Sequence, residues 1–276
     1  MRRVLTVIVP ASNEAAWIGG CLEALFASAP VPGGAECIVV ANGCRDATAA
    51  RARAMAGQAQ AAGWGLTVLD LAPGGKTLAL NAGDRAARGG LRAYLDADVR
   101  VSPPLMAQIA AALADDTPRY ATGTPRIPAA HSRITRAYAR FWQRLPFAAG
   151  HAPGFGLFAV NAAGRARWGA WPQIISDDGL ARLHFAPTER AQVPASYDWP
   201  MVEGFDALVR VRRRQDAGMA ELARIYPGLM QNGSDRPNSD LIARLAAADP
   251  AGFAAYAAVA VAVRLRRAGP GFTRGR

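Results

Sequence analysis

The chain has 276 residues, of which 51% are hydrophobic, and carries a formal net charge of +11 at pH 7. A chain of this length and hydrophobicity can bury a large core, which excludes a protein that is disordered throughout. The charge favours anionic partners such as phosphates and acidic lipids, and because no nucleic-acid-binding motif accompanies it, we expect no nucleic-acid partner.

The first hundred residues predict strands that alternate with helices, the pattern of β-α-β units on a mainly parallel sheet. The predicted strands are Val4–Val9, which Pro10 is expected to end, Glu36–Ala41, Leu66–Leu71 and Leu91–Leu95. The predicted helices are Asn13–Ala27, Asp46–Ala62 and Thr77–Arg88. The sequence therefore predicts an α/β fold.

The rest of the chain is less regular. It predicts a helix after Pro104, a strand over Tyr120–Thr124, a helix over His131–Phe147, a loop leading into a strand over Gly154–Val160 and the start of a helix over Asp177–Phe185. The turn-rich segment Asn232–Asn238 is the best candidate for a boundary before the C-terminal helices. We expect one domain over residues 1–230 and a helical tail over residues 231–276.

The cysteines and the apolar runs indicate a compartment. Cys21, Cys37 and Cys44 have neither paired nor metal-type spacing, and no charged-then-apolar leader precedes the first predicted strand. We therefore expect a cytoplasmic protein. The apolar run 251–263 is shorter than the roughly 20 residues that span a bilayer, so we expect a docked or interfacial helix there and no transmembrane span.

Two carboxylates follow the fourth predicted strand directly, in Asp96-Ala97-Asp98. In an extended segment alternate side chains share a face, so Asp96 and Asp98 can aim their oxygens at one point. Mg²⁺ or Mn²⁺ held by one or two carboxylates usually completes its shell with water and the phosphates of a nucleotide. The pair indicates a metal site for a diphosphate, and the alternative is a solvated turn.

Polar side chains follow all four of these strands, at the edge of the sheet where ligands of open α/β folds bind. They are Ser12, Asn13 and Glu14 after the first strand, Asn42, Arg45 and Asp46 after the second, Lys76 after the third, and Asp96 and Asp98 after the fourth. This order predicts a pocket for a base, a ribose, phosphates and a metal. Lys76 is the single lysine among the 32 basic residues, and its alternative role is that of a solvated side chain after a glycine turn.

Four segments carry a likeness to a known family. They are Pro10–Glu14, Val39–Thr48, Gly75–Gly83 and Asp96–Asp98, and the likeness resumes around residues 154–185. In this order they resemble the successive signatures of family 2 glycosyltransferases with the GT-A fold. The resemblance implies a Rossmann-like, mainly parallel sheet flanked by helices in one catalytic domain, with a nucleotide-binding half over about 1–100 and an acceptor half over about 101–230.

The resemblance also implies roles at the donor site. Pro10, Ala11, Ser12, Asn13 and Glu14 would line the nucleoside site, Lys76 would meet the phosphates, and Asp96 and Asp98 would hold Mn²⁺ or Mg²⁺. Asn42 stands where the family usually has an aspartate that reads the pyrimidine edge, and an amide can donate as well as accept. Ser12 replaces the family's frequent tyrosine, so the base that the site prefers stays open.

For the transfer step, the resemblance implies an acidic pair at the start of a helix, Asp177 and Asp178. An inverting enzyme needs one carboxylate to remove the proton of the acceptor hydroxyl. We prefer Asp177 as this base, in which case Ser176 replaces the family's glutamate. Asp178 is the alternative, and both acids could simply stabilise a helix N-terminus.

Four further residues have two interpretations each. His184 could add a nitrogen ligand to the metal or be an ordinary packed histidine. Gly154 and Gly156 could let the backbone approach the donor sugar or merely form a turn. Arg214 stands where processive relatives have an arginine followed by tryptophan, and it could neutralise the leaving diphosphate or belong to a solvated basic face. The tryptophan is missing, which favours transfer of a single sugar.

A basic stripe along the predicted helix 131–147 suggests a membrane contact. Its arginines are Arg133, Arg136, Arg140 and Arg144, and Ile134, Tyr138, Phe141, Trp142 and Leu145 accompany them. This profile suits a helix on anionic lipid, which would make the protein peripheral on the inner face of the membrane. The alternative is an amphipathic helix whose aromatic residues pack inside the fold.

The sequence therefore predicts a metal-dependent, inverting, non-processive glycosyltransferase. Its donor would be a nucleotide-diphosphate sugar, and its acceptor a hydroxyl of a saccharide, a small molecule or a lipid-linked molecule. One alternative is a non-catalytic protein that binds nucleotide-sugars or docks to membranes through a degenerate site. A nucleotidyltransferase is less favoured, since the segment after the first strand, Pro10–Glu14, is not a Gly- and Arg-rich phosphate loop.

Overall fold

The computed structural model describes residues 4–233 and 237–265. They form two compact units. The first unit contains the described residues up to 126 together with 154–173 and 184–199, and the second contains 127–153, 174–183 and the described residues from 200 onward. Part of the predicted boundary segment, residues 234–236, lies outside the described residues, and the predicted division at residues 100 and 230 stays a prediction.

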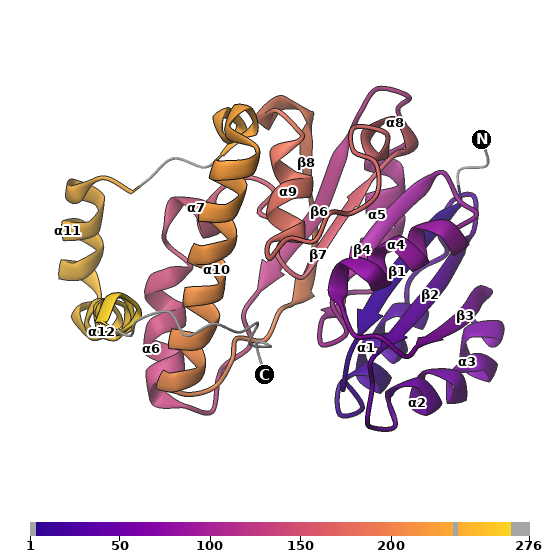
Figure 1. Cartoon of the computed structure of the whole chain (residues 1–276), viewed down its shortest axis with the longest axis horizontal. Helices are drawn as coiled ribbons and strands as arrows, with labels where there is room; N and C mark the ends of the chain where they lie inside the picture. Colours follow the sequence, from indigo (N-terminus) through magenta and orange to yellow (C-terminus); the bar gives the residue numbers. More distant parts are fainter. Residues whose placement is uncertain (1–3, 234–236, 266–276) are drawn as a thin grey trace. The chain divides into compact units, whose positions relative to one another are not determined.

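The first unit contains one sheet with the strand order β3-β2-β1-β4-β7-β6-β8-β5 (Figure 1). Its strands are β1 (Leu5–Ala11), β2 (Ala35–Asn42), β3 (Trp64–Leu71), β4 (Leu91–Leu95), β5 (Arg100–Val101), β6 (Tyr120–Arg126), β7 (Leu157–Val160) and β8 (Arg190–Asp198). Strands β1 to β4 pair in parallel, which confirms the predicted α/β fold. Beyond them the sheet is mixed, because β7 runs antiparallel to both β4 and β6.

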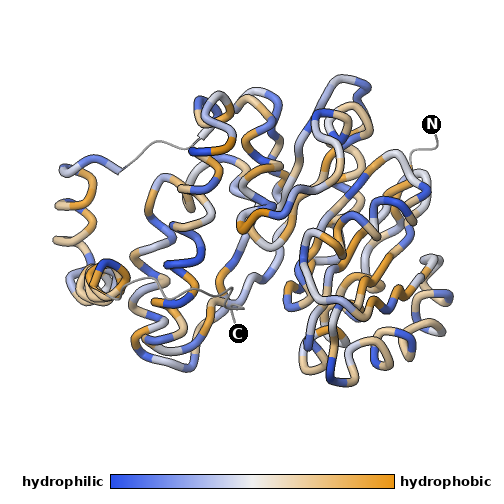
Figure 2. The backbone as a smooth tube through the Cα atoms, viewed as in Figure 1, coloured by the Kyte–Doolittle hydropathy of each residue, from blue (hydrophilic) through white to orange (hydrophobic). Residues whose placement is uncertain are grey.

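Helices cover both faces of this sheet. They are α1 (Ile18–Phe26), α2 (Thr48–Ala54), α3 (Ala56–Ala61), α4 (Lys76–Ala86), α5 (Leu105–Ala112) and α8 (Ala162–Arg165), with a 3₁₀ turn η1 over Pro187–Glu189. Strands β1 and β2 are apolar along most of their length (Figure 2) and almost entirely buried. Val7 and Val9 join the core that includes α1, α2, α3 and α5. Ile8 points to the opposite face, where α4 lies so close that a Cβ on Gly83 would be 2.4 Å from it.

The structure corrects the predicted start of the chain. Strand β1 continues through Pro10 to Ala11, because its pairing with β4 ends at Ile8 and Pro10 has β2 alone as a neighbour. A proline is tolerated where one side of a strand is unpaired. The first helix begins at Ile18 rather than at Asn13, because Asn13 adopts a left-handed conformation with φ of 57°.

Two helices that were predicted as single elements are interrupted. The segment Asp46–Ala62 forms α2 and α3, which meet at Met55, and Gly57 lowers the helix propensity just after the break. The segment His131–Phe147 forms α6 (Arg133–Trp142) and α7 (Pro146–Ala149). Pro146 explains the second break, since the residue before a proline is driven out of the helical region.

The second unit is helical in its described residues. It contains α6 and α7, α9 (Asp177–Leu183), α10 (Phe205–Ile225), a 3₁₀ turn η2 over Pro227–Asn232, α11 (Ser239–Ala248) and α12 (Pro250–Leu265). Helix α12 packs on α6, with Phe253 against Phe141 and Tyr256 against Tyr138 at ring distances of 5.6 Å. The aromatic residues of α6 are therefore buried inside this unit. No helix in the described part of the chain has both the length and the apolar character needed to cross a bilayer.

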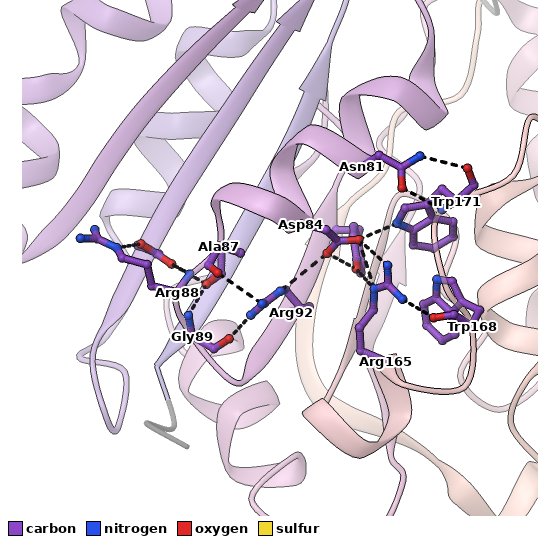
Figure 3. Close-up of polar contacts among 12 residues, drawn as sticks. Asn81, Asp84, Ala87, Arg88, Gly89, Arg92, Arg165, Trp168 and Trp171 are labelled. Carbon is purple, nitrogen blue, oxygen red and sulfur yellow. Dashed lines mark hydrogen bonds and ion pairs between the residues drawn. The ribbon is translucent and has the colours of Figure 1, made fainter.

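One carboxylate, Asp84 on α4, fastens three elements of the first unit together (Figure 3). It accepts hydrogen bonds from the Tyr94 hydroxyl on β4 (2.8 Å), from Arg165 Nη2 on α8 (2.8 Å) and from Trp171 Nε1 (2.8 Å). The Asp84 and Arg165 side chains are only 13% and 18% exposed. Burial, followed by the charge of Asp84, raises the pKa of Tyr94 well above its ordinary value, so its hydroxyl keeps the proton that it donates.

Replacement of Asp84 by alanine should lower the free energy of unfolding by about 3–5 kcal/mol, because the Arg165 guanidinium would lose its buried counter-charge. Urea denaturation measures this change. The matched control is Asp70→Ala, which removes an ion pair to Arg53 that is about half exposed and should cost no more than about 1 kcal/mol. Equal losses of unfolding free energy in the two variants would show that Asp84 contributes no more stability than an exposed ion pair does.

Candidate active site

The segments that follow β1 and β2 are joined by side-chain hydrogen bonds. Ser12 Oγ donates to the Asn42 carbonyl oxygen (2.7 Å), and Asn13 Oδ1 accepts from the Arg45 backbone N–H (2.8 Å). The left-handed conformation of Asn13 turns the chain so that this second bond can form. The structure therefore brings the predicted nucleoside segment, Pro10–Glu14, together with residues 42–45.

Asp46 anchors the same region. Its carboxylate accepts hydrogen bonds from the backbone N–H groups of Ala15 (3.1 Å) and Thr48 (3.0 Å), and the Thr48 hydroxyl accepts from the Glu14 N–H (2.8 Å). Burial tends to raise the pKa of Asp46, but the hydrogen bonds from Thr48 and Ala15 outweigh it and lower the pKa below its ordinary value. This anchoring role was not predicted, although an aspartate two residues before a threonine at a helix start is its usual signature.

Asn42, the last residue of β2, is buried, with 3% of its surface exposed. Its Nδ2 donates to the carbonyl oxygens of Ala11 (2.9 Å) and Val40 (3.3 Å), and its Oδ1 accepts from the Gly75 N–H (2.9 Å). Backbone groups of the protein therefore form hydrogen bonds with both the nitrogen and the oxygen of the Asn42 side chain. Contact of Asn42 with a base stays a prediction.

Lys76 and Asp96 form an ion pair at the ends of β3 and β4. The Lys76 Nζ lies 3.1 Å from Asp96 Oδ1, and the two side chains are 41% and 37% exposed. Lys76 is the first residue of α4, the helix that Asp84 holds against β4. The structure thus places the lone lysine beside the first carboxylate of Asp96-Ala97-Asp98, and the roles of these residues toward a donor stay predictions.

The carboxylate pair fits a divalent metal by its chemistry. Ala97 is buried while Asp96 and Asp98 are partly exposed, and both charges contribute, after burial itself, to raising the pKa of the Cys21 thiol. Among residues 4–233 and 237–265, no three His, Cys, Asp or Glu side chains form a cluster that could hold a metal. A donor diphosphate and water would have to complete the shell, as they commonly do for Mg²⁺.

Gly154 and Gly156, which could let the backbone approach a donor sugar, are both required by packing. Gly154 and Gly156 both have φ of 75°, a conformation that favours glycine. A Cβ on Gly154 would lie 1.6 Å from the Tyr120 hydroxyl, and one on Gly156 would lie 2.4 Å from the Trp199 ring. The Gly156 carbonyl accepts from the Asp96 N–H (2.9 Å), which ties this loop to the carboxylate pair.

His184 packs against aromatic and basic side chains. Its ring stacks on Trp168 with a centroid distance of 5.4 Å, and its carbonyl oxygen accepts from Arg167 Nη1 (2.6 Å). Burial, followed by the charge of Arg167, lowers the pKa of His184. In the described part of the chain His184 does not assemble with Asp96 and Asp98 into a three-ligand cluster, so its role as a metal ligand stays a prediction.

The predicted acidic pair lies in the second unit, in the first turn of α9. Asp177 is 5% exposed. Asp178 is less buried, and its Oδ1 accepts from the Gly179 N–H (2.8 Å) and the Ser176 hydroxyl (3.0 Å). Arg214 lies on α10, partly buried. The choice between Asp177 and Asp178 as the base stays open.

Three solved structures with the same fold are glycosyltransferases, each less than 25% identical to this chain. A mannosyltransferase from Pyrobaculum calidifontis in complex with GDP-Man and Mn²⁺ is 23% identical, with a TM-score of 0.60 over 97% of this chain and 76% of that one. TarS from S. aureus in complex with UDP-GlcNAc is 14% identical, with a TM-score of 0.57 over 95% and 76%. Glucosyl-3-phosphoglycerate synthase from Mycobacterium tuberculosis in complex with Mn²⁺ and UDP-glucose is 19% identical, with a TM-score of 0.54 over 86% and 82%.

The family assignment comes from the sequence itself. No curated protein sequence matches the chain, but the family model of glycosyl transferase family 2 matches residues 6–166, which is more than half of it. The match includes the strands β1 to β4 and every polar segment that follows them. Together with the GT-A architecture of the similar structures, this match confirms the predicted resemblance: the chain belongs to glycosyl transferase family 2.

Proposed function

We propose that the protein transfers one sugar, with inversion, from a nucleotide-diphosphate donor to a hydroxyl acceptor, and that a divalent metal is required. The ion pair between Lys76 and Asp96 is the observation that carries this proposal. In it, a cation and a metal-binding carboxylate lie together after β3 and β4, the strands that neighbour those carrying the joined segments 10–14 and 42–46. Positive charge and metal-binding oxygens are both needed where a diphosphate leaves.

The donor would bind with its nucleoside beside residues 10–14 and its phosphates toward Lys76. Asp96 and Asp98 are the groups that would hold Mn²⁺ or Mg²⁺, and the metal would neutralise charge on the departing nucleoside diphosphate. With a donor diphosphate present, Asp96 would be one of the groups that hold the metal, and Lys76 would be released from its pair with Asp96. The Lys76 ammonium can then reach a phosphate oxygen, because its four-carbon stem is flexible.

The acceptor hydroxyl must lose a proton as its oxygen attacks the anomeric carbon. Asp177 is the preferred base and Asp178 the alternative. The Ser176 hydroxyl donates to the Asp178 carboxylate at 3.0 Å, which supports a positioning role for Asp178. Arg214 would contact the diphosphate. The acceptor would be a saccharide, a small molecule or a lipid-linked molecule.

Donor binding can be tested by thermal unfolding with UDP-, GDP- and dTDP-sugars, with and without Mn²⁺. One donor at about 100 times its Kd should raise the Tm by roughly 5 °C, and only with the metal present. Asp98→Asn should abolish the shift, whereas Asp70→Asn on the exposed end of β3 should keep it. A Tm shift of the same size with and without Mn²⁺ would exclude the proposed role of the carboxylate pair. If no donor releases its nucleoside diphosphate, the non-catalytic alternative is favoured.

The base can be identified by comparing Asp177→Asn with Asp178→Asn once a donor and an acceptor are known. Removal of the base should lower kcat by about 100-fold or more while the Kd of the donor stays the same. The other substitution serves as the control and should lower kcat much less. A large loss in Asp178→Asn with a small one in Asp177→Asn would reverse our assignment.

We also propose that the second unit attaches to anionic membranes. Arg133, Arg136 and Arg140 of α6 and Arg144 just after it are exposed. Helix α12, which packs on α6, exposes 51% of Val261 and 76% of Leu265. Arginines near an anionic surface contribute about 1 kcal/mol each. Because the aromatic residues of α6 are buried, charge has to provide most of the attachment.

Vesicle co-sedimentation tests this attachment. The protein should bind phosphatidylglycerol vesicles at low salt, should be released at about 0.5 M NaCl because the charges are screened, and should not bind phosphatidylcholine vesicles. Arg133→Glu combined with Arg144→Glu should weaken binding at least tenfold. Equal binding to both kinds of vesicle would contradict the proposal.

A further inference from the structure

The side-chain amide of Asn42 joins three separate backbone segments. It donates to Ala11 O at the end of β1 and to Val40 O in its own strand, and it accepts from Gly75 N–H in the loop before α4. Both N–H bonds of the amide have acceptors, and the oxygen has a donor. A buried polar group with all its partners in place is expensive to disturb.

These segments carry the donor site. Ala11 directly precedes Ser12, Asn13 and Glu14, and Gly75 directly precedes Lys76. The loops after β2 and β3 also touch through their backbones, since a Cβ on Gly43 would lie 2.6 Å from Gly74 Cα. Asn42 is therefore the side chain through which the nucleoside segment and the Lys76 segment are held to one another.

The geometry requires an amide at this position. A carboxylate could still accept from Gly75 N–H, but it has no hydrogen to donate. An ionised aspartate would place a charged oxygen about 3 Å from two carbonyl oxygens in a buried site, which is unfavourable. The asparagine that replaces the family's usual aspartate thus has a structural explanation.

We infer that Asn42 is a positioning residue that keeps the nucleoside segment and Lys76 in register, and that it does not read the base. The inference rests on the proposed donor site. Selectivity for the base then belongs to other groups, and Asn42 acts on every donor alike through the placement of Lys76.

Isothermal titration of Asn42→Asp with UDP, GDP, dTDP and inorganic diphosphate, each with Mn²⁺, tests this inference. All four ligands should bind more weakly by a common factor of about ten, diphosphate included, because the change disturbs Lys76. A residue that reads the base would instead change the ratios among the three nucleotides and leave diphosphate binding as in the wild type. That outcome would overturn the inference.

The pH dependence of the same variant provides a second readout. Burial beside two carbonyl oxygens should raise the pKa of the introduced carboxyl. Below that pKa the neutral acid can donate one hydrogen bond to Ala11 O, so the affinity of Asn42→Asp for diphosphate, relative to wild type, should recover as pH falls from 8 to 5. A constant ratio over this range would contradict the proposed donor role.

Asn161 provides a matched control. It is also 3% exposed, its Nδ2 donates to Asp115 O and Thr117 O, and its Oδ1 accepts from two backbone N–H groups. Asn161→Asp should lower the Tm about as much as Asn42→Asp without changing the four affinities. Equal losses of affinity in the two variants would show that general destabilisation explains the effect.

Hydrogen exchange tests the coupling without any ligand. In Asn42→Ala the Gly75 amide loses its acceptor, so a peptide that covers residues 73–78 should exchange at least tenfold faster than in the wild type or in Asn161→Ala. Unchanged exchange there would contradict the inference even if the donors bind. A wild-type protein that binds none of the four ligands would instead refute the proposed function and leave this measurement to decide the role of Asn42.

Discussion

The carboxylate of Asp84 is the contact on which the placement of α4, and through it Lys76, depends. Its partners come from β4, from α8 and from the loop at Trp171, so one side chain connects segments that are up to 87 residues apart. Arg165 adds hydrogen bonds to the carbonyl oxygens of Trp168 and Gly169. Because the Asp84 and Arg165 side chains are both largely buried, α4 has little freedom to move away from β4.

The candidate site was predictable where its signals are local. The ends of β1 to β4 were located to within a few residues because the apolar runs stop near Pro10, Asn42, Pro73 and Asp96. Parallel strands bring such ends to one edge. Contacts that connect distant residues were not predictable. Nothing in the sequence pairs Asp84 with Arg165, and the direction of the Asn42 amide depends on Gly75, which lies 33 residues away.

Predictions of local structure also failed where a backbone feature outweighed helix or strand propensity. Asn13 looked like a helix cap, but its left-handed conformation serves the turn that brings Asn13 to Arg45. The alanine-rich segment after Asp46 looked like one helix, although its composition says little about where such a helix breaks. The antiparallel strand β7 had the same apolar character as a parallel one, and only its pairing partners reveal its direction.

Part of the positive charge that the 32 basic residues carry is committed to ion pairs inside the first unit. Arg165 pairs with Asp84, Arg88 with Glu36 and Arg167 with Glu189. The hydrogen bond from Arg167 lowers the pKa of Glu189 to about 2, so that pair persists at any ordinary pH. Arg165 and Arg167 are only 18% and 26% exposed and are poorly placed to recruit an anion, whereas Arg88 is 78% exposed. A guanidinium forms rigid, two-point contacts with a carboxylate, whereas an ammonium is a compact charge on a flexible stem. If Asp96 holds the proposed metal, a rigid guanidinium contact at position 76 would compete with that metal more strongly than the ammonium of Lys76 does. The single lysine of the chain therefore pairs with Asp96, the carboxylate that the proposed metal site would need to have released.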